Sequence, residues 1–147
     1  MRSVSRPLVC LNLMMLLLVM ACTCNEEKMN VPINVEEQIQ QFMQKEKFLP
    51  DDQFFYPGLG DRRLRLIITG KMNKAAQGFL KVAQSENVNP KMFHEEMDIS
   101  LLQFKEFNLD SEEVERVCHY YEELMDIVDL ESSDGRLNKF RYGFDPS

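Results

Sequence analysis

The sequence predicts an all-α protein, built as a small four-helix bundle-like domain with an aromatic loop and an extended C-terminal tail. Three observations lead to this fold class. Four stretches carry apolar residues three or four positions apart, the spacing that places them on one face of a helix. Proline, glycine and asparagine stand between these stretches and mark turns. The chain has 147 residues, which suits a single domain.

The first predicted helix runs from Val35 to about Lys47. Apolar residues recur along this stretch at helical spacing. Asn34 stands three residues before Glu37, and such a pair can satisfy the free backbone N–H groups at the start of a helix. The segment before this helix is polar and contains a proline, so we expect it to be a tether rather than part of the domain.

The segment at positions 49–61 is predicted to be a loop, because two prolines and two glycines interrupt it. We call it the aromatic loop after three adjacent rings in its middle. These rings belong to Phe54, Phe55 and Tyr56. Three neighbouring rings bury a large apolar area, so we expect them to fold under the neighbouring helices and to cover the core as a lid. A binding surface formed by the same rings is the alternative.

The second predicted helix begins near Asp61 and extends to Ala83. Gly70 lies in its middle and costs about 1 kcal/mol relative to alanine, a cost that close packing could offset. Three arginines stand at its start, where the helix dipole disfavours cations. This arginine cluster comprises Arg62, Arg63 and Arg65. We expect the cluster to be solvated and paired with the acidic surface, and a small anion site is the alternative.

The third predicted helix begins after Asn89, which is followed by a proline at the first helical position, and runs to about Phe107. The fourth begins after Asp110 and carries an apolar stripe as far as Val128. The final segment at positions 136–147, RLNKFRYGFDPS, alternates between polar and apolar residues more than it follows a helical spacing. We therefore expect it to pack in extended form across the bundle.

The N-terminus predicts a cleaved secretory signal. Arg2 and Arg6 precede an apolar run from Pro7 to Ala21. A helix needs roughly 20 residues to cross the hydrocarbon core of a bilayer, and this run is shorter. A positive start followed by a short apolar segment is typical of a signal peptide, whereas an uncleaved signal anchor is the alternative.

The residues that end this run, VMAC at positions 19–22, resemble the lipobox of bacterial lipoproteins. The resemblance implies that Cys22 becomes the first residue of the mature chain and carries acyl chains such as palmitate. Cys24 is the rival site, but Thr23 before it fits the pattern less well. Two or three acyl chains hold a protein at a membrane for long times. The predicted organisation is a signal peptide at 1–21, a lipidated flexible tether at 22–34 and a helical domain at 35–147.

Charge and cysteine content narrow the function classes. Cleavage after residue 21 would remove Arg2 and Arg6 from the 17 basic residues and leave all 24 acidic ones, so the formal charge would change from −7 to −9. Such a charge disfavours binding to nucleic acid. In an oxidising compartment Cys24 and Cys118 could pair, but the apolar helical neighbours of Cys118 favour a buried thiol.

One short segment resembles a metal-binding motif but lacks one of the required ligands. His94 begins the stretch HEEMD, whereas the zinc-protease motif requires a second histidine at the position of Asp98. His94 and Asp98 would share a helix face with Glu95 beside them, and these three residues define the alternative function, a metal-binding or hydrolytic envelope protein. An exposed acidic helix start explains the same residues without a metal. We expect no cofactor.

Three segments, FYPGLGDRRLRL, ERVCHYYEELMDIVDLES and LNKFRYGFDP, make residues 35–146 similar to an uncharacterised bacterial family with a domain of unknown function. The resemblance implies one compact helical domain and no assigned activity. We therefore expect a bacterial cell-envelope protein, lipid-anchored to a membrane, whose domain binds a protein partner through the aromatic loop and the arginine cluster. A structural envelope component without a specific ligand is a further alternative.

Overall fold

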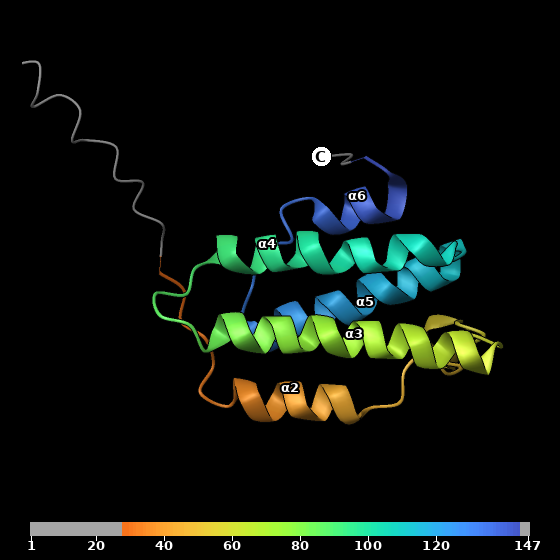
Figure 1. Cartoon of the computed structure of the whole chain (residues 1–147), viewed down its shortest axis with the longest axis horizontal. Helices are drawn as coiled ribbons and strands as arrows, with labels where there is room; N and C mark the ends of the chain where they lie inside the picture. Colours follow the sequence, from red (N-terminus) through yellow and green to blue (C-terminus); the bar gives the residue numbers. More distant parts are fainter. Residues whose placement is uncertain (1–27, 145–147) are drawn as a thin grey trace, which may run out of the picture.

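Residues 28–144 are described by the computed structural model, in which they form an all-α bundle (Figure 1). Helices α3, α4 and α5 make its centre, while α2 and α6 cover opposite sides. The five α-helices of this range are α2 (Val35–Gln44), α3 (Arg62–Ala83), α4 (Pro90–Leu101), α5 (Ser111–Val128) and α6 (Arg136–Tyr142), and two 3₁₀ helices are η1 (Asp52–Phe54) and η2 (Leu102–Phe107). The predicted all-α fold class is confirmed.

Residues 1–27 contain the predicted signal peptide, Cys22 and Cys24, and they lie outside the described residues. Among the helices at positions 28–144, none combines the length and the apolar character needed to cross a membrane. The segment just before α2 contacts the bundle, because Met29 donates its backbone N–H to the carbonyl of Val88 at 2.8 Å. Met29 and Val31 also pack against the core. The packed part of the chain therefore includes residues ahead of Val35, where we expected the helical domain to begin.

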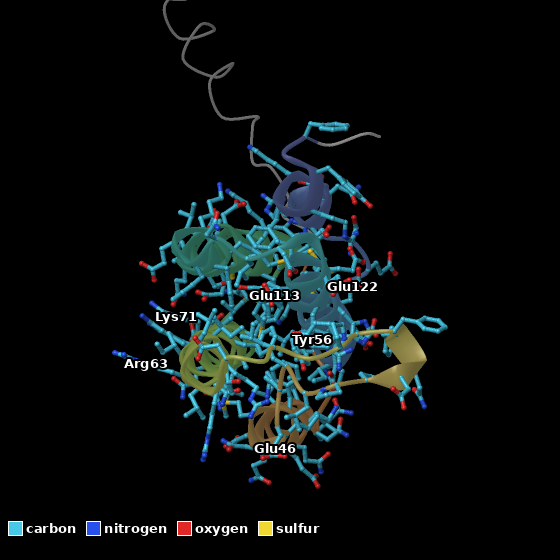
Figure 2. All side chains as sticks on the ribbon, turned by 90° about the vertical axis from the view of Figure 1, so that its right-hand side faces the viewer. Glu46, Tyr56, Arg63, Lys71, Glu113 and Glu122 are labelled. Carbon is cyan, nitrogen blue, oxygen red and sulfur yellow. The ribbon has the colours of Figure 1, made fainter. Side chains whose placement is uncertain are left out.

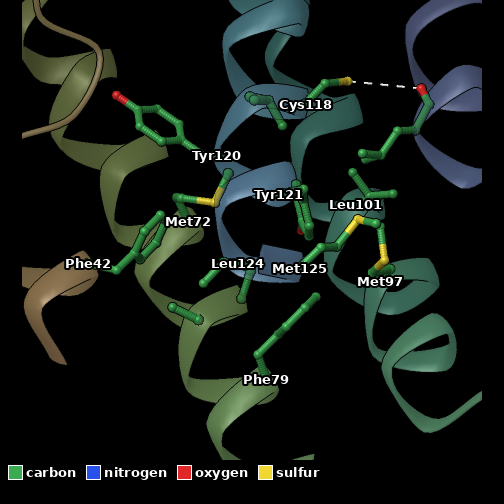
Figure 3. Close-up of a cluster of buried hydrophobic side chains, with 14 of the residues drawn as sticks. Phe42, Met72, Phe79, Met97, Leu101, Cys118, Tyr120, Tyr121, Leu124 and Met125 are labelled. Carbon is green, nitrogen blue, oxygen red and sulfur yellow. Dashed lines mark hydrogen bonds between the residues drawn. The ribbon is translucent and has the colours of Figure 1, made fainter. Parts of the chain in front are cut away.

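Most side chains of the core lie at positions that the helical spacing indicated, and Figure 3 shows its centre. Leu59, Val88 and Leu130 join the core from segments between the helices, whereas Ile67 is exposed. Tyr121 is fully buried there, and its hydroxyl donates to the Oγ of Ser100 at 2.8 Å. Cys118 is a buried free thiol whose Sγ lies 3.9 Å from the carbonyl oxygen of Leu137. The expected buried thiol at Cys118 is confirmed, and burial raises its pKa to about 11.

Three of the four predicted helix starts are confirmed by their side-chain caps. Asp61 accepts hydrogen bonds from two N–H groups of α3, and Asn89 accepts from Met92 at the start of α4. Asp110 forms a reciprocal capping box with Glu113 at the start of α5. These caps satisfy N–H groups that have no partner within the helix.

The remaining helix start and two helix ends differ from the prediction. Asn34 occupies the N-cap position of α2 but makes no side-chain cap, so the predicted pairing with Glu37 does not form. This helix ends at Gln44 rather than at Lys47, whose amine turns back to the carbonyl oxygens at the helix end. The third predicted helix is α-helical only to Leu101 and continues as η2.

The predicted extended C-terminal tail is wrong for residues 136–142, which form α6. Gly135 has a φ of 72°, which lets the chain turn into this helix. Leu137 and Phe140 stand three positions apart and both pack against the core, so a helical spacing prevails over the apparent alternation. Gly70 also differs from expectation: no heavy atom lies within 4 Å of a Cβ built there, so close packing does not explain it.

Candidate functional site

The aromatic loop closes on itself and gives its three rings different environments. Asp51 and Tyr56 pair as an isolated antiparallel bridge, with N···O distances of 2.8 and 3.0 Å, and η1 lies between them. Tyr56 is buried, whereas Phe54 is 54% exposed and Phe55 is 92% exposed. The expectation that the rings cover the core is right for Tyr56 and wrong for Phe55. Tyr56 is one end of the bridge, whereas Phe54 and Phe55 lie in the turn between its two ends.

Arg116 of α5 holds this loop against the bundle. Its Nη2 lies 2.8 Å from the Oδ2 of Asp51, and this hydrogen bond holds the pKa of Asp51 below its ordinary value. Its guanidinium lies 5.5, 5.3 and 5.0 Å from the ring centroids of three aromatic residues. These are Phe54, Tyr56 and Tyr120, in that order. The buried Nε and Nη1 have no hydrogen-bond acceptor among the described residues, and the surrounding ring faces supply the electrostatic attraction instead.

Phe54 and Phe55 differ in what supports them. The ring of Phe54 lies 4.4 Å from the imidazole of His119, centroid to centroid, at an interplanar angle of 47°. Phe55 follows η1 with a φ of 51°, in the left-handed region that a residue with a Cβ rarely adopts. A large apolar side chain is thus exposed to solvent on a backbone conformation that disfavours it.

A groove with a cavity volume of about 440 Å³ lies between the aromatic loop and α5. We call it the η1 groove. It is lined by Phe54, Phe55, Tyr56, Ser111, Glu112, Glu115, Arg116, His119 and Glu122. The residues from α5 recur every three or four positions, so one face of that helix forms the groove floor. In Figure 2, which faces this end of the bundle, Tyr56 and Glu122 lie on the side from which η1 projects.

The carboxylates of the η1 groove are only partly neutralised. Arg141 of α6 forms ion pairs with Glu115 at 2.6 Å and with Glu122 at 3.3 Å. His119 lies 3.7 Å from the other carboxylate oxygen of Glu122. Glu112 has no ion-pair partner within residues 28–144. The groove therefore combines exposed rings on one wall with a negatively charged floor.

The arginine cluster lies apart from the aromatic loop. None of its members lines the η1 groove, and Figure 2 shows Arg63 on the flank opposite η1. Arg62 and Arg65 border a separate hollow of about 310 Å³ that Lys47 also lines. Within the described part of the chain no ion pair involves the cluster, so the expected pairing with acidic residues is not found. The loop and the cluster do not form one site.

Two of the three residues of the predicted metal alternative have structural partners. The Nε2 of His94 lies 2.8 Å from the carbonyl oxygen of Ser132, and Asp98 forms an ion pair with Arg136 at 3.1 Å. Glu95 is exposed. These contacts join α4 to the segment that leads into α6. Across positions 28–144, no group of three histidine, cysteine or acidic side chains is placed to hold a metal ion.

Sequence reasoning missed the residues of α5 that form the groove floor. Arg116 was not singled out, although it is a basic residue between Glu115 and the buried Val117 in an otherwise acidic helix. Its partner Asp51 is 65 positions away in the sequence, so helical spacing could not connect the two. His119, which also lines the groove, was not predicted to belong to a site either. The sequence offers one signal for this floor. Polar residues recur every three or four positions along α5 and thus share one face of that helix.

The fold and the groove together define the class: a small all-α domain with one ring-lined, acidic groove among its described residues. The chain belongs to the family described as "Domain of unknown function (DUF4844)", whose profile matches residues 30–145. The expected membership of an uncharacterised domain family is confirmed.

A crystal structure of a DUF3571 family protein from Acinetobacter baumannii is similar to this chain. The TM-score is 0.69 and the sequence identity is 33%, with 74% of this chain and 89% of that chain covered. A comparison with curated proteins finds no match.

Proposed function

We propose that this chain is a lipid-anchored cell-envelope protein whose helical domain binds another protein through the η1 groove. The observation that carries the proposal is Phe55, which is 92% exposed at a φ of 51°. Backbone strain of this kind costs of order 1–3 kcal/mol and is concentrated at functional sites. A partner that covers the ring would remove a large apolar surface from water, which is how aromatic residues come to dominate interfaces.

The rest of the loop is built to hold Phe55 in place. The bridge between Asp51 and Tyr56 fixes both ends of the turn, and Arg116 fixes the turn to α5 through Asp51. A ring that is already positioned loses little conformational freedom when a partner binds. This preorganisation favours a binding role over a loop that merely connects α2 with α3.

The position of the groove suits attachment at the other end of the molecule. Figure 1 shows the segment ahead of α2 entering at one end of the bundle and η1 at the opposite end. Helix α3 connects these ends, and its 22 residues correspond to about 33 Å at 1.5 Å per residue. A chain anchored through Cys22 would reach Lys28 within roughly 20 Å of the membrane. Because the groove and the attachment point lie at opposite ends of the bundle, the groove is free to face away from the membrane surface.

Photo-crosslinking in the bacterial envelope tests the proposal. A benzophenone amino acid replaces Phe55 in the full chain, and the matched control carries it in place of Leu66, which is also an exposed apolar residue. We expect a discrete protein adduct from position 55 in the membrane fraction and none from position 66. Equal adduct patterns from both positions, or no adduct from position 55, would contradict protein binding at the groove.

A further inference from the structure

We propose that the η1 groove receives an arginine side chain of the partner, carried on a segment with a neighbouring apolar residue. The inference rests on the proposed protein-binding function and adds the chemistry of the bound segment. The apolar residue would contact Phe55, and the guanidinium would lie between the exposed rings and the carboxylates of α5.

The charge of the groove favours a cation. Glu112, Glu115 and Glu122 line it, and the charge of Arg116 is taken up by Asp51 at 2.8 Å. Arg141 satisfies only part of the acidic floor, because the side chains of Glu115 and Glu122 remain 60% and 48% exposed. A carboxylate accepts several hydrogen bonds at once, so these two residues can take a second donor. Charge complementarity of this kind selects partners and orients them.

The fold itself already binds arginines with the same two kinds of group. Arg116 is held by the carboxylate of Asp51 and by the surrounding ring faces. Arg141 is held by Glu115 and Glu122, and its guanidinium lies 5.8 Å from the ring centroid of Tyr142. The groove presents a third set, formed by exposed rings and acidic side chains, and it is open to solvent.

Arginine fits this set better than lysine does. A planar guanidinium stacks on an aromatic face and can donate to two carboxylates from one plane, whereas an ammonium group acts as a compact point charge. The ring of Phe54, held against His119, and the exposed ring of Phe55 provide the faces. Glu112 and Glu115 are three positions apart in α5, so their carboxylates are neighbours on the groove floor.

A peptide selection on the purified full chain tests the inference. A displayed library of random 12-residue peptides is selected on the immobilised protein, and the enriched peptide is labelled with fluorescein for anisotropy titrations. We expect enriched peptides to carry arginine beside an apolar residue. We also expect replacement of that arginine by lysine to weaken binding several-fold, and by glutamine roughly tenfold or more, on the scale of a cation–π contact combined with an ion pair.

Variants of the chain locate the bound peptide. We expect Glu112→Lys and Phe55→Ala each to weaken binding roughly tenfold, which is within the range of an interface hot spot. The control Glu37→Lys makes the same charge change in the first turn of α2, and Leu66→Ala removes another exposed apolar side chain. Both controls should leave affinity unchanged. Thermal melts by circular dichroism verify that all four variants fold.

Three outcomes would overturn the inference. They are the absence of any enriched peptide, enriched peptides without arginine, and enriched peptides that bind Glu112→Lys and Phe55→Ala as tightly as the wild type. Acidic or neutral peptides that still require Phe55 would overturn the choice of arginine and leave protein binding at the groove intact. Failure of the proposed function itself appears separately, as the absence of a specific adduct from position 55 in the crosslinking experiment.

Discussion

Gly78 of α3 and Glu96 of α4 lie directly against each other, so that a Cβ added to Gly78 would overlap the carboxylate of Glu96. The absence of a side chain at position 78 lets the acidic side chain lie across the neighbouring helix. This contact partly buries the carboxyl group, and burial raises the pKa of Glu96, with Lys81 and Lys74 opposing the rise. The close packing of α3 on α4 at this pair therefore affects the pKa of one carboxyl group.

The substitution Gly78→Ala should stabilise the protein by about 0.5–1 kcal/mol. Alanine is favoured over glycine within a helix by about 1 kcal/mol, and the atoms that would clash belong to the mobile end of Glu96. When this carboxylate swings toward solvent, it also regains hydration. Urea unfolding measures the change, and Gly70→Ala is the matched control, since nothing lies within 4 Å of a Cβ there. A loss of stability in Gly78→Ala alone would show that Glu96 cannot move.

The pKa of Glu96 predicts how stability depends on pH. The folded protein binds this proton more tightly than the unfolded chain does. Stability should therefore fall as pH rises from the ordinary pKa of a glutamate through the raised one, and it should stay lower above that window. Glu96→Gln should remove this fall, whereas Glu95→Gln, at an exposed neighbouring position, should preserve it. Urea unfolding at a series of pH values measures the dependence, and identical profiles for the two variants would contradict the assignment.

The lowered pKa of Lys47 predicts that stability rises with pH in the alkaline range. Its amine is buried against the carbonyl oxygens of Phe42 and Lys45, and burial lowers its pKa from 10.5 to about 8, partly opposed by Glu123. Between pH 8 and 10.5 the unfolded chain binds more protons at this position, so stability should rise with pH in that window. Lys47→Met should abolish this rise.

The control for this experiment is Lys105→Met, which removes an exposed lysine. The slope of stability against pH is the informative quantity, because Lys47→Met also leaves two carbonyl oxygens without their donor. An unchanged slope in Lys47→Met would contradict the lowered pKa.

The helices could be predicted because their information is local. Caps such as Asp61 and Asp110 act within three residues, and the apolar spacing of α5 lies in one continuous stretch. The η1 groove could not be predicted in the same way. It depends on Asp51 meeting Arg116 across 65 positions, a contact that only the packing of the loop on α5 creates.

The aromatic loop shows a second limit of the sequence. Its three adjacent rings look equivalent in composition, yet Tyr56 is buried and Phe55 is exposed. The difference arises from one backbone bridge and from the left-handed conformation of a single residue, neither of which a hydrophobic pattern encodes. Likewise, the seven residues of α6 alternate between polar and apolar character. They are helical because a helix places both Leu137 and Phe140 against the core.

Cys22→Ser should release the protein from membranes if the predicted acylation occurs. Serine lacks the thiol that would receive the diacylglyceryl group. Fractionation of cells grown with labelled palmitate measures both effects, and Cys24→Ser is the matched control because Cys24 is the rival site. Equal membrane attachment of both variants and wild type, without label, would contradict the lipoprotein prediction.

Phe55→Gly should raise stability while it weakens partner binding. Glycine adopts a φ of 51° without the cost of roughly 1–2 kcal/mol that a Cβ imposes, although its freer unfolded chain offsets about half of that gain. Loss of the ring itself should cost the isolated protein little, because the side chain is 92% exposed. The matched variant Phe55→Ala also lacks the ring but keeps the strained backbone, so we expect it to be about 0.5–1 kcal/mol less stable than Phe55→Gly in urea unfolding.

Both variants should bind the selected peptide more weakly than the wild type. Opposite changes in stability and affinity are expected where a strained residue is retained for function. If Phe55→Gly proved less stable than Phe55→Ala, the backbone at this position would not be strained, and the principal argument for a binding role of Phe55 would fail.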